Sequence, residues 1–545
     1  MPFARGLFAT ALFATTLCLT FACSPEGTGE TQTDPSMRAA PTVPVHGGVV
    51  RGAWAEEEAG IAVFKGLPYA APPIGDARFR PPGAYRGWTG ERDATEFGPA
   101  CIQPTRLEMW VWSRGDFEVS EDCLFLNVWS RHDAEQATTR PVMVWFHGGG
   151  HVSGTGADLI FDGTNLARRD VVAVTINYRL GPWGFLAHPA LAAESSHRAA
   201  GNYGLFDKIA ALNWVRDNIG QFGGDPDNVT IFGQSAGSAS VCALMASPLA
   251  QGLFHKAIGQ SAACVLELPA GDSAGLERGQ RLVDALPGDG SADAMRAATI
   301  DDIFHALETT DWQSETLITR DGWLLPESPL SIFARGEHTA VPLLLGSMSN
   351  EGEQLIPLDE TLTAKALRAY AADTFGQGAD EVLTAYAADA AVSPGHAQWQ
   401  IATDLFMAFA MRRWAGFNTR ADAPTYLYFM DHAPPTFRLY VPENPALPGG
   451  PRAGGAYHSG DLALVFDNLN LVGLDWNEVD RRVANTLVTY WTNFAKNGNP
   501  NGVGVETWPA YHPEHHTTQR LGESIESIAG ARRAKLDAMD GALAR

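Results

Sequence analysis

Five apolar segments of strand length restrict the fold more than any other feature of this 545-residue sequence. Each has hydrophobic side chains at consecutive positions, so both of its faces need cover, as in a parallel sheet between two helical layers. Residues 205–222 and 478–495 have apolar side chains at helical spacing instead. Strands that alternate with such helices predict a doubly wound α/β sheet. The five segments are residues 141–147, 171–177, 229–233, 342–346 and 425–430.

The length and composition allow one large α/β domain with insertions or two domains. Hydrophobic residues make up 45% and charged residues 19%, which is typical of a globular protein. Residues 265–335 and 355–420 are Ala-rich with helical patterns, so we expect helical insertions that cover the site. A net charge of −23 repels phosphate backbones, and no nucleic-acid partner is expected.

The N-terminal segment predicts export. Residues 7–22 are apolar and small but too short to span a bilayer comfortably, so residues 1–22 are interpreted as a signal peptide. The run that ends at Cys23 is similar to a lipoprotein cleavage box, which predicts lipidation of Cys23; an ordinary signal peptide is the alternative. Residues 23–44 predict a flexible tether before a folded domain at 45–535. We therefore expect an envelope lipoprotein, or a secreted or periplasmic protein.

Export permits disulfides, and four cysteines remain after the signal: Cys101, Cys123, Cys242 and Cys264. Four cysteines allow three pairings. A bridge between Cys101 and Cys123 would close a loop of about 20 residues, worth roughly 3 kcal/mol. Cys242 and Cys264 would then be either a second bridge or two buried thiols.

The strongest local signal is Gly-Gln-Ser-Ala-Gly at residues 233–237. It follows an apolar strand and precedes a run of small residues, 238–246, that can begin a helix. A sharp strand-to-helix turn crowds its neighbours, so glycine is needed on both sides of a serine whose hydroxyl is lifted clear of the backbone. This context predicts that Ser235 is a catalytic nucleophile; a tight glycine turn without catalysis is the alternative.

A second signal is His-Gly-Gly-Gly at residues 147–150, directly after a strand. The carbonyl oxygen of an ester becomes negative during acyl transfer, and backbone N–H groups must already point at it. The amides of Gly149, Gly150 and Ala236 are therefore the candidates for an oxyanion hole. A phosphate-binding loop is the rival interpretation, but no Gly-Lys-Ser/Thr sequence follows and no dinucleotide-binding spacing occurs.

A serine hydroxyl needs a base, and the base needs an acid to orient it. In folds with such a serine turn, the chain order is serine, acid, histidine. Glu351 lies just after the strand at 342–346 and is well placed as the acid. Asp431 is a rival, because it ends the strand at 425–430.

The candidate base is His458, in the glycine-rich loop 454–461, which is flexible enough to reach Ser235. His432 is the rival base, since it also follows the last apolar strand. No His/Cys set has metal-ligand spacing, so no metal or other cofactor is expected. A polar cluster near the C-terminus is expected at the surface, and it comprises His512, His515 and His516.

Several longer motifs resemble the type-B carboxylesterase family, which includes cholinesterases and fungal lipases. They are Phe-Lys-Gly-Leu-Pro-Tyr-Ala at 64–70, Ser-Glu-Asp-Cys-Leu-Phe-Leu-Asn-Val-Trp at 120–129, and the segment 201–237. The similarity runs from about residue 45 to about residue 518. It implies an α/β-hydrolase fold, with a mostly parallel central sheet and large helical insertions, in an exported bacterial member.

The resemblance also implies which residues act. It favours Glu351 over Asp431 and His458 over His432, so that Ser235, Glu351 and His458 form a triad. It implies an oxyanion hole at Gly149, Gly150 and Ala236, and a bridge between Cys101 and Cys123. Ser261 resembles a serine that supports the acid and base from behind; a packed turn serine is the alternative.

The sequence departs from the family pattern at three places. His151 stands where an aromatic or apolar residue usually follows the glycines, which puts the acyl pocket in doubt. Gln234 precedes the nucleophile where glutamate is common, which weakens any preference for cationic substrates. The segment 108–110 resembles the cholinesterase segment with the choline-binding tryptophan, but its spacing to Cys123 is longer here. Trp110 or Trp112 therefore either faces an alcohol group by cation–π contact or packs in the interior.

These observations predict a serine carboxylesterase that hydrolyses small-molecule esters through an acyl-enzyme on Ser235. One alternative is a cholinesterase-like enzyme, and another is an acyltransferase or peptidase with the same machinery. A non-catalytic binding module of the same fold is the third. The physiological ester and the oligomeric state are left open.

Overall fold

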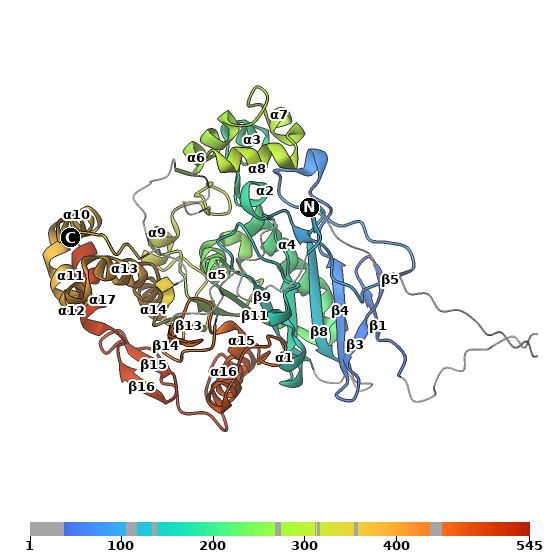
Figure 1. Ribbon diagram of the computed structural model, residues 1–545. Helices are drawn as coiled ribbons and strands as arrows, with labels where there is room; N and C mark the ends of the chain where they lie inside the picture. The colour runs from blue at the N-terminus through green and yellow to red at the C-terminus, as the bar shows by residue number, and fades with distance from the viewer. Residues whose placement is uncertain are drawn as a thin grey trace, which may run out of the picture. The chain divides into compact units, whose positions relative to one another are not determined.

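The computed structural model describes residues 38–104, 117–132, 139–266, 274–310, 312, 317–353, 358–436 and 449–544. Ala40–Arg545 form one compact unit around an eleven-stranded sheet (Figure 1). The strand order in this sheet is β16-β15-β14-β13-β12-β11-β9-β10-β8-β4-β3. The strands are β3 (Ala53–Glu56), β4 (Ile61–Pro68), β8 (Phe125–Arg131), β9 (Arg140–Phe146), β10 (Val172–Ile176), β11 (Gly224–Gln234), β12 (Lys256–Gln260), β13 (Leu343–Met348), β14 (Thr425–Met430), β15 (Thr517–Leu521) and β16 (Ile525–Ala529).

The middle of the sheet is parallel, from β10 through β9, β11, β12, β13 and β14 to β15, and the strands at both edges pair antiparallel. This is the predicted mostly parallel sheet, and all five predicted strands occur. Two small sheets accompany it, one of β1 (Thr42–Val45), β2 (Gly48–Arg51) and β5 (Glu91–Asp93), the other of β6 (Ala100–Cys101) and β7 (Val119–Ser120).

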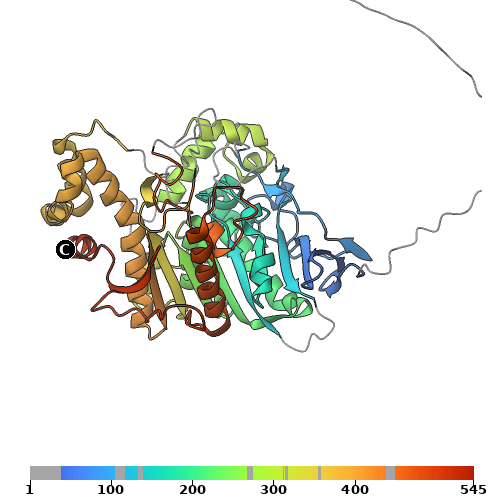
Figure 2. The same cartoon turned by 60° about the horizontal axis from the view of Figure 1, so that its bottom comes forward.

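Strand β9 shows why the central strands are apolar on both faces. Val142, Val144 and Phe146 belong to one hydrophobic core, and Met143 and Trp145 belong to a second core. Helices α4 (Tyr203–Asn218) and α5 (Ala236–Ala246) pack into the first core. Helices α1 (Thr164–Arg168), α15 (Leu462–Val465) and α16 (Glu478–Asn497) pack into the second (Figure 2). Burial of both faces therefore accounts for the continuous apolar runs.

The expected helical insertions are present in two groups. Helices α6 (Ala274–Asp284), α7 (Ala292–Ala297) and α8 (Ile300–Glu308) lie together, and α10 (Ala364–Phe375) and α11 (Ala379–Ala385) lie beside α17 (Arg533–Leu543) (Figure 1). The other helices are α2 (Gly181–Phe185), α3 (Pro189–Glu194), α9 (Pro329–Ala334), α12 (Ala387–Val392), α13 (Pro394–Asp404) and α14 (Ala410–Arg420).

The folded unit is longer than the predicted range of 45–535. Strand β1 begins at Thr42, inside the segment expected to be tether, and α17 continues to Leu543. Cys23 and the predicted signal lie outside the described residues, as do Trp110 and Trp112. Across the described part of the chain, no helix combines the length and the apolar character that crossing a bilayer requires.

Candidate active site

The candidate residues follow the carboxyl ends of neighbouring parallel strands. Strand β9 leads into the glycine loop 147–150, β11 into Ser235, and β13 into Glu351. Ligand sites in open α/β sheets form at this edge, because parallel strands present their carboxyl ends together. The topology therefore brings distant parts of the sequence to one place.

Ser235 occupies a strained turn between β11 and α5. Its φ of 55° and ψ of −126° are rare for a residue with a side chain, and such strain persists only where the surroundings enforce it. Gly237 lets the turn pack against β9, since a Cβ atom there would lie 1.9 Å from the carbonyl oxygen of Phe146. The amide of Ala239 donates to the Ser235 carbonyl at 2.9 Å, which starts the helix directly behind the hydroxyl.

The glycine loop lies against this turn. A Cβ atom added to Gly148 would lie 3.2 Å from the Cβ of Ser235, so the two segments are in contact. Gly149 has a φ of +95°, and its carbonyl accepts from the amides of Val152 and Ser153 at 3.0 Å each. Among the described residues, the amides of Gly149, Gly150 and Ala236 donate to no carbonyl. These N–H groups are therefore available to a negative oxygen, as an oxyanion hole requires.

Glu351 and His458 form a buried pair. His458 Nδ1 lies 2.6 Å from Glu351 Oε2, and the amide of Met348 donates to Glu351 Oε1 at 2.7 Å. The two loops meet at an isolated β-bridge next to the pair, where the Asn350 amide donates to the Ala456 carbonyl at 3.0 Å. The carboxylate thus fixes the imidazole with its proton on Nδ1 and leaves Nε2 as an acceptor.

The side chain of Gln234 contacts the second ring nitrogen of His458. Its Nε2 lies 3.0 Å from His458 Nε2, and its Oε1 has no hydrogen-bond partner among the described residues. Within that part of the chain, His458 makes no hydrogen bond with Ser235. The amide of Gln234 therefore occupies the lone pair that would receive the serine proton.

The rival acid and the rival base are engaged elsewhere. Asp431 accepts from Arg520 Nε at 2.6 Å, in a partly exposed ion pair. His432 is buried and its Nε2 lies 2.7 Å from Asp480, which also binds Arg452. The geometry thus brings together the pair favoured by the resemblance and not these two side chains.

Ser261 is buried in a left-handed backbone conformation, with a φ of 55°, and its amide donates to the Gly346 carbonyl at 2.9 Å. Its hydroxyl has no hydrogen-bond partner among the described residues. The predicted supporting contact to Glu351 or His458 is therefore not formed by hydrogen bonding here.

The buried carboxyl of Asp461 was not predicted from the sequence. Gln260 donates to its Oδ2 at 2.7 Å, and Oδ1 has no partner among the described residues. Burial, with a smaller contribution from the nearby Glu351 charge, raises the pKa of Asp461 to about 6. The only sequence signal is its place in the loop of His458, and burial could not be read from that.

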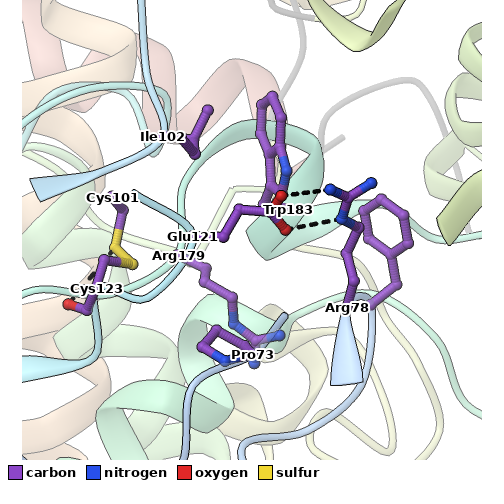
Figure 3. A pocket seen from close by; sticks show the side chains of 9 residues that line it. Pro73, Arg78, Cys101, Ile102, Glu121, Cys123, Arg179 and Trp183 are labelled. Carbon is purple, nitrogen blue, oxygen red and sulfur yellow. Dashed lines mark hydrogen bonds and ion pairs between the residues drawn. A yellow bond between two sulfur atoms is a disulfide. The ribbon is translucent and has the colours of Figure 1, made fainter. Parts of the chain in front are cut away.

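A small pocket lies apart from these residues (Figure 3). Its lining includes Arg78, Glu121, Trp183 and the bridged Cys101 and Cys123. The Arg78 guanidinium binds Glu121 (Nε to Oε2, 2.7 Å) and two backbone carbonyls, so its donors are used within the protein. We interpret this pocket as structural.

The described residues contain two disulfides. Cys101 pairs with Cys123, as the resemblance implies, and Cys242 pairs with Cys264, which decides the alternative left open between a bridge and two thiols. One set of metal-ligand side chains in the described residues lies within 4.8 Å, formed by His512, Glu514 and His515. All three are exposed, and none belongs to the site. His512 and His515 thus lie at the surface as expected, whereas His516 is half-buried, with its Nδ1 2.9 Å from the Tyr511 hydroxyl.

Comparisons with known proteins agree with this architecture. The sequence profile of the carboxylesterase family matches residues 39–538. The chain is 34% identical to para-nitrobenzyl esterase of Bacillus subtilis over 483 residues (86% of this chain, 92% of the relative) and 33% identical to fumonisin B1 esterase of Sphingopyxis macrogoltabida over 480 residues (83% and 82%). A solved thermophilic PNB esterase superposes with a TM-score of 0.79 at 32% identity, covering 92% of this chain and 100% of that structure.

Proposed function

The chain belongs to the carboxylesterase family and is a carboxylic ester hydrolase, and from this premise we propose that it works through an acyl-enzyme on Ser235. One observation carries the assignment. His458 binds Glu351 through one nitrogen at 2.6 Å, and its other nitrogen lies 3.0 Å from Gln234, the residue next to Ser235. The proposed base is therefore oriented by the acid and contacts the residue that precedes the proposed nucleophile.

In the proposed reaction, Ser235 Oγ attacks the ester carbonyl carbon while His458 Nε2 accepts its proton. The carbonyl electron pair moves to the oxygen, which the amides of Gly149, Gly150 and Ala236 bind. Collapse of this intermediate breaks the bond to the alcohol, which leaves with the proton from His458. A water molecule then attacks the acyl-enzyme by the same steps and releases the acid. For the first step, the Gln234 amide must leave Nε2 free for the serine.

The test is Ser235→Ala, which should remove nearly all activity, with a loss on the order of 10⁶-fold in kcat. The substrate is a chromogenic short-chain ester, and the wild-type chain should also be labelled by a fluorophosphonate while the variant is not. Normal turnover by the variant contradicts the nucleophile. A wild-type chain that neither labels nor turns over is a binding module instead, and ester products formed with added alcohols would indicate an acyltransferase.

For the substrate class, we propose uncharged carboxylic esters. The relatives are named for different substrates, such as para-nitrobenzyl esters and fumonisin B1, so no single ester follows from them. Gln234 places a neutral amide beside the base where a carboxylate would attract a cation. The test compares the hydrolysis rates of a choline ester and of its uncharged isostere. A strong preference for the choline ester contradicts the proposal.

Two disulfides indicate an extracellular or secreted protein. We propose further that residues 1–22 are removed as a signal peptide and that Cys23 becomes lipidated, with residues 24–41 linking the anchor to β1. Mass spectrometry of the mature N-terminus tests this. An unmodified terminus contradicts the lipid anchor and leaves the catalytic proposal untouched.

A further inference from the structure

His151 follows the glycine loop directly and is almost completely buried, with 5% of its surface exposed. Its backbone is left-handed, with a φ of 61°, and its carbonyl accepts from the Gly181 amide at 2.7 Å. The ring packs against Phe185, with 4.7 Å between ring centroids. The residue is therefore held firmly by both its backbone and its side chain. His151, whose presence after the glycines put the acyl pocket in doubt, is thus a buried side chain that packs within the protein.

The imidazole of His151 bonds to the helix that follows the nucleophile. His151 Nε2 lies 2.9 Å from Ser240 Oγ, and Ser240 Oγ donates to the Ala236 carbonyl at 2.8 Å. The single hydroxyl proton of Ser240 is used toward Ala236, so the oxygen accepts from a proton on His151 Nε2. A continuous chain of two hydrogen bonds thus joins residue 151 to the first turn of α5.

We propose that His151 is a positioning residue. It fixes the spacing of the N–H donors of the oxyanion hole, because its hydrogen bonds connect the two backbone segments that carry them. Two of the proposed donors, Gly149 and Gly150, precede His151 directly, and the third is the amide of Ala236. These segments come from different strands, so no short covalent connection fixes their spacing. Donors of this kind act only when they are already directed at the developing charge. The inference rests on the proposed acyl-enzyme mechanism.

The surroundings of His151 favour one neutral form of its ring. Burial lowers the pKa of His151 well below its usual value, and the nearby Lys208 and His147 lower it further, while the Ala236 carbonyl acts in the opposite direction. Among the described residues, the titratable Tyr178 also lies beside it, with 6.2 Å between ring centroids. A neutral imidazole carries one N–H group, and the hydrogen bond to Ser240 uses this group.

Two variants break the chain of hydrogen bonds, Ser240→Ala and His151→Phe, and they are compared with the double variant. We expect each to lower kcat per titrated active site by about 10–100-fold while KM changes by less than about 3-fold. The affinity for a trifluoromethyl ketone, whose adduct carries an oxyanion, should fall in proportion to kcat/KM. Because both side chains act through one link, the double variant should resemble the worse single variant.

His151→Gln is the conservative control, since its amide can donate at a similar reach, and it should recover most of the kcat lost in His151→Phe. Thr492→Val is the matched control for a lost buried hydroxyl, because Thr492 donates to the Val488 carbonyl at 2.8 Å within α16. It should leave kcat unchanged.

Single variants with kcat within about 2-fold of wild type, or with independent effects that multiply in the double variant, overturn the inference. Fluorophosphonate labelling separates this outcome from failure of the mechanism. All of these variants should still label at Ser235, whereas a wild-type chain that does not label contradicts the acyl-enzyme itself.

Discussion

Burial sets the charge of several side chains near Ser235. It lowers the pKa of His147 to about 3, and it raises the pKa of Asp461 to about 6. His147 stacks on Tyr178 with 4.3 Å between ring centroids, so it supports the glycine loop as a neutral ring. At this scale the candidate site consists of a hydrogen-bonded acid and base, Glu351 and His458, beside buried groups whose charged forms are disfavoured.

The raised pKa of Asp461 predicts a pH-dependent stability. The folded protein holds this proton more tightly than the unfolded chain, whose value is near 3.8. The stabilisation is therefore complete below about pH 4 and is lost as the pH rises through about 6, by about 3 kcal/mol in total. Asp461→Asn removes this titration. As the pH is raised from 4 to 7, the free energy of unfolding measured in urea should therefore fall more in the wild type than in the variant. A difference that is constant across this range contradicts the prediction, and exposed Asp301→Asn is the control.

Gln234 gives a prediction for specificity. Gln234→Glu places a carboxylate beside His458, where the neutral amide now lies. We expect the ratio of kcat/KM for a choline ester to that for its uncharged isostere to rise about 5–10-fold, which corresponds to roughly 1 kcal/mol of attraction at short range. Gln234→Met, which adds no charge, should leave the ratio unchanged, and an unchanged ratio in Gln234→Glu would contradict the electrostatic explanation.

At the scale of elements, the C-terminal helix α17 supports the loop of Glu351. Arg532 occupies the N-cap position of this helix in a left-handed conformation, with a φ of 49°. Its guanidinium donates to the Ser349 carbonyl at 2.5 Å and to Gln400 at 2.9 Å, and it also binds Asp404, which is buried. The last helix is therefore tied to the backbone two residues before the proposed acid.

Arg532→Ala should be strongly destabilising, because it leaves the Asp404 carboxylate buried without its cation, and we expect a loss of roughly 3–5 kcal/mol. We also expect lower kcat, since the loop of Glu351 loses an anchor. Arg520→Ala is the matched control: it breaks the partly exposed pair with Asp431 and should cost about 0–1 kcal/mol. Equal losses in the two variants, measured by denaturant unfolding, would contradict this distinction.

At the scale of the whole molecule, two cores on opposite faces of the sheet hold the strands, and two disulfides tie segments outside those strands. The bridge from Cys242 to Cys264 connects α5, which follows the nucleophile, to the chain just after β12. It therefore fastens the helix that carries Ala236 to the neighbouring strand.

Removing this bridge, in Cys242→Ala with Cys264→Ala, should lower stability by about 3 kcal/mol, the value for closing a loop of about 20 residues. Thermal unfolding followed by tryptophan fluorescence measures the loss. Added reductant should then destabilise the wild type more than the variant, which keeps the bridge from Cys101 to Cys123 but lacks the second one. A variant that unfolds at the wild-type temperature contradicts the prediction.

The elements that the sequence predicted best are those whose pattern is strong over a long stretch. The helix expected at 478–495 is α16, which begins at a capping box of Asn477 and Asp480 and ends before Gly498. Strand β12 was missed, because its sequence Lys-Ala-Ile-Gly-Gln is short and has one strongly apolar residue. It is a strand because β11 and β13 supply partners on both sides.

By itself, the sequence determined the layered α/β architecture, the serine turn and the glycine loop, because local spacing and backbone sterics dictate them. It also narrowed the acid and base to two carboxylates and two imidazoles. Only the tertiary structure decided that Glu351 meets His458 while His432 meets Asp480, that Cys242 meets Cys264, and that His151 reaches Ser240. The physical reason is that pairing, burial and pKa depend on which distant segments the strand order brings together, and no local pattern carries that information.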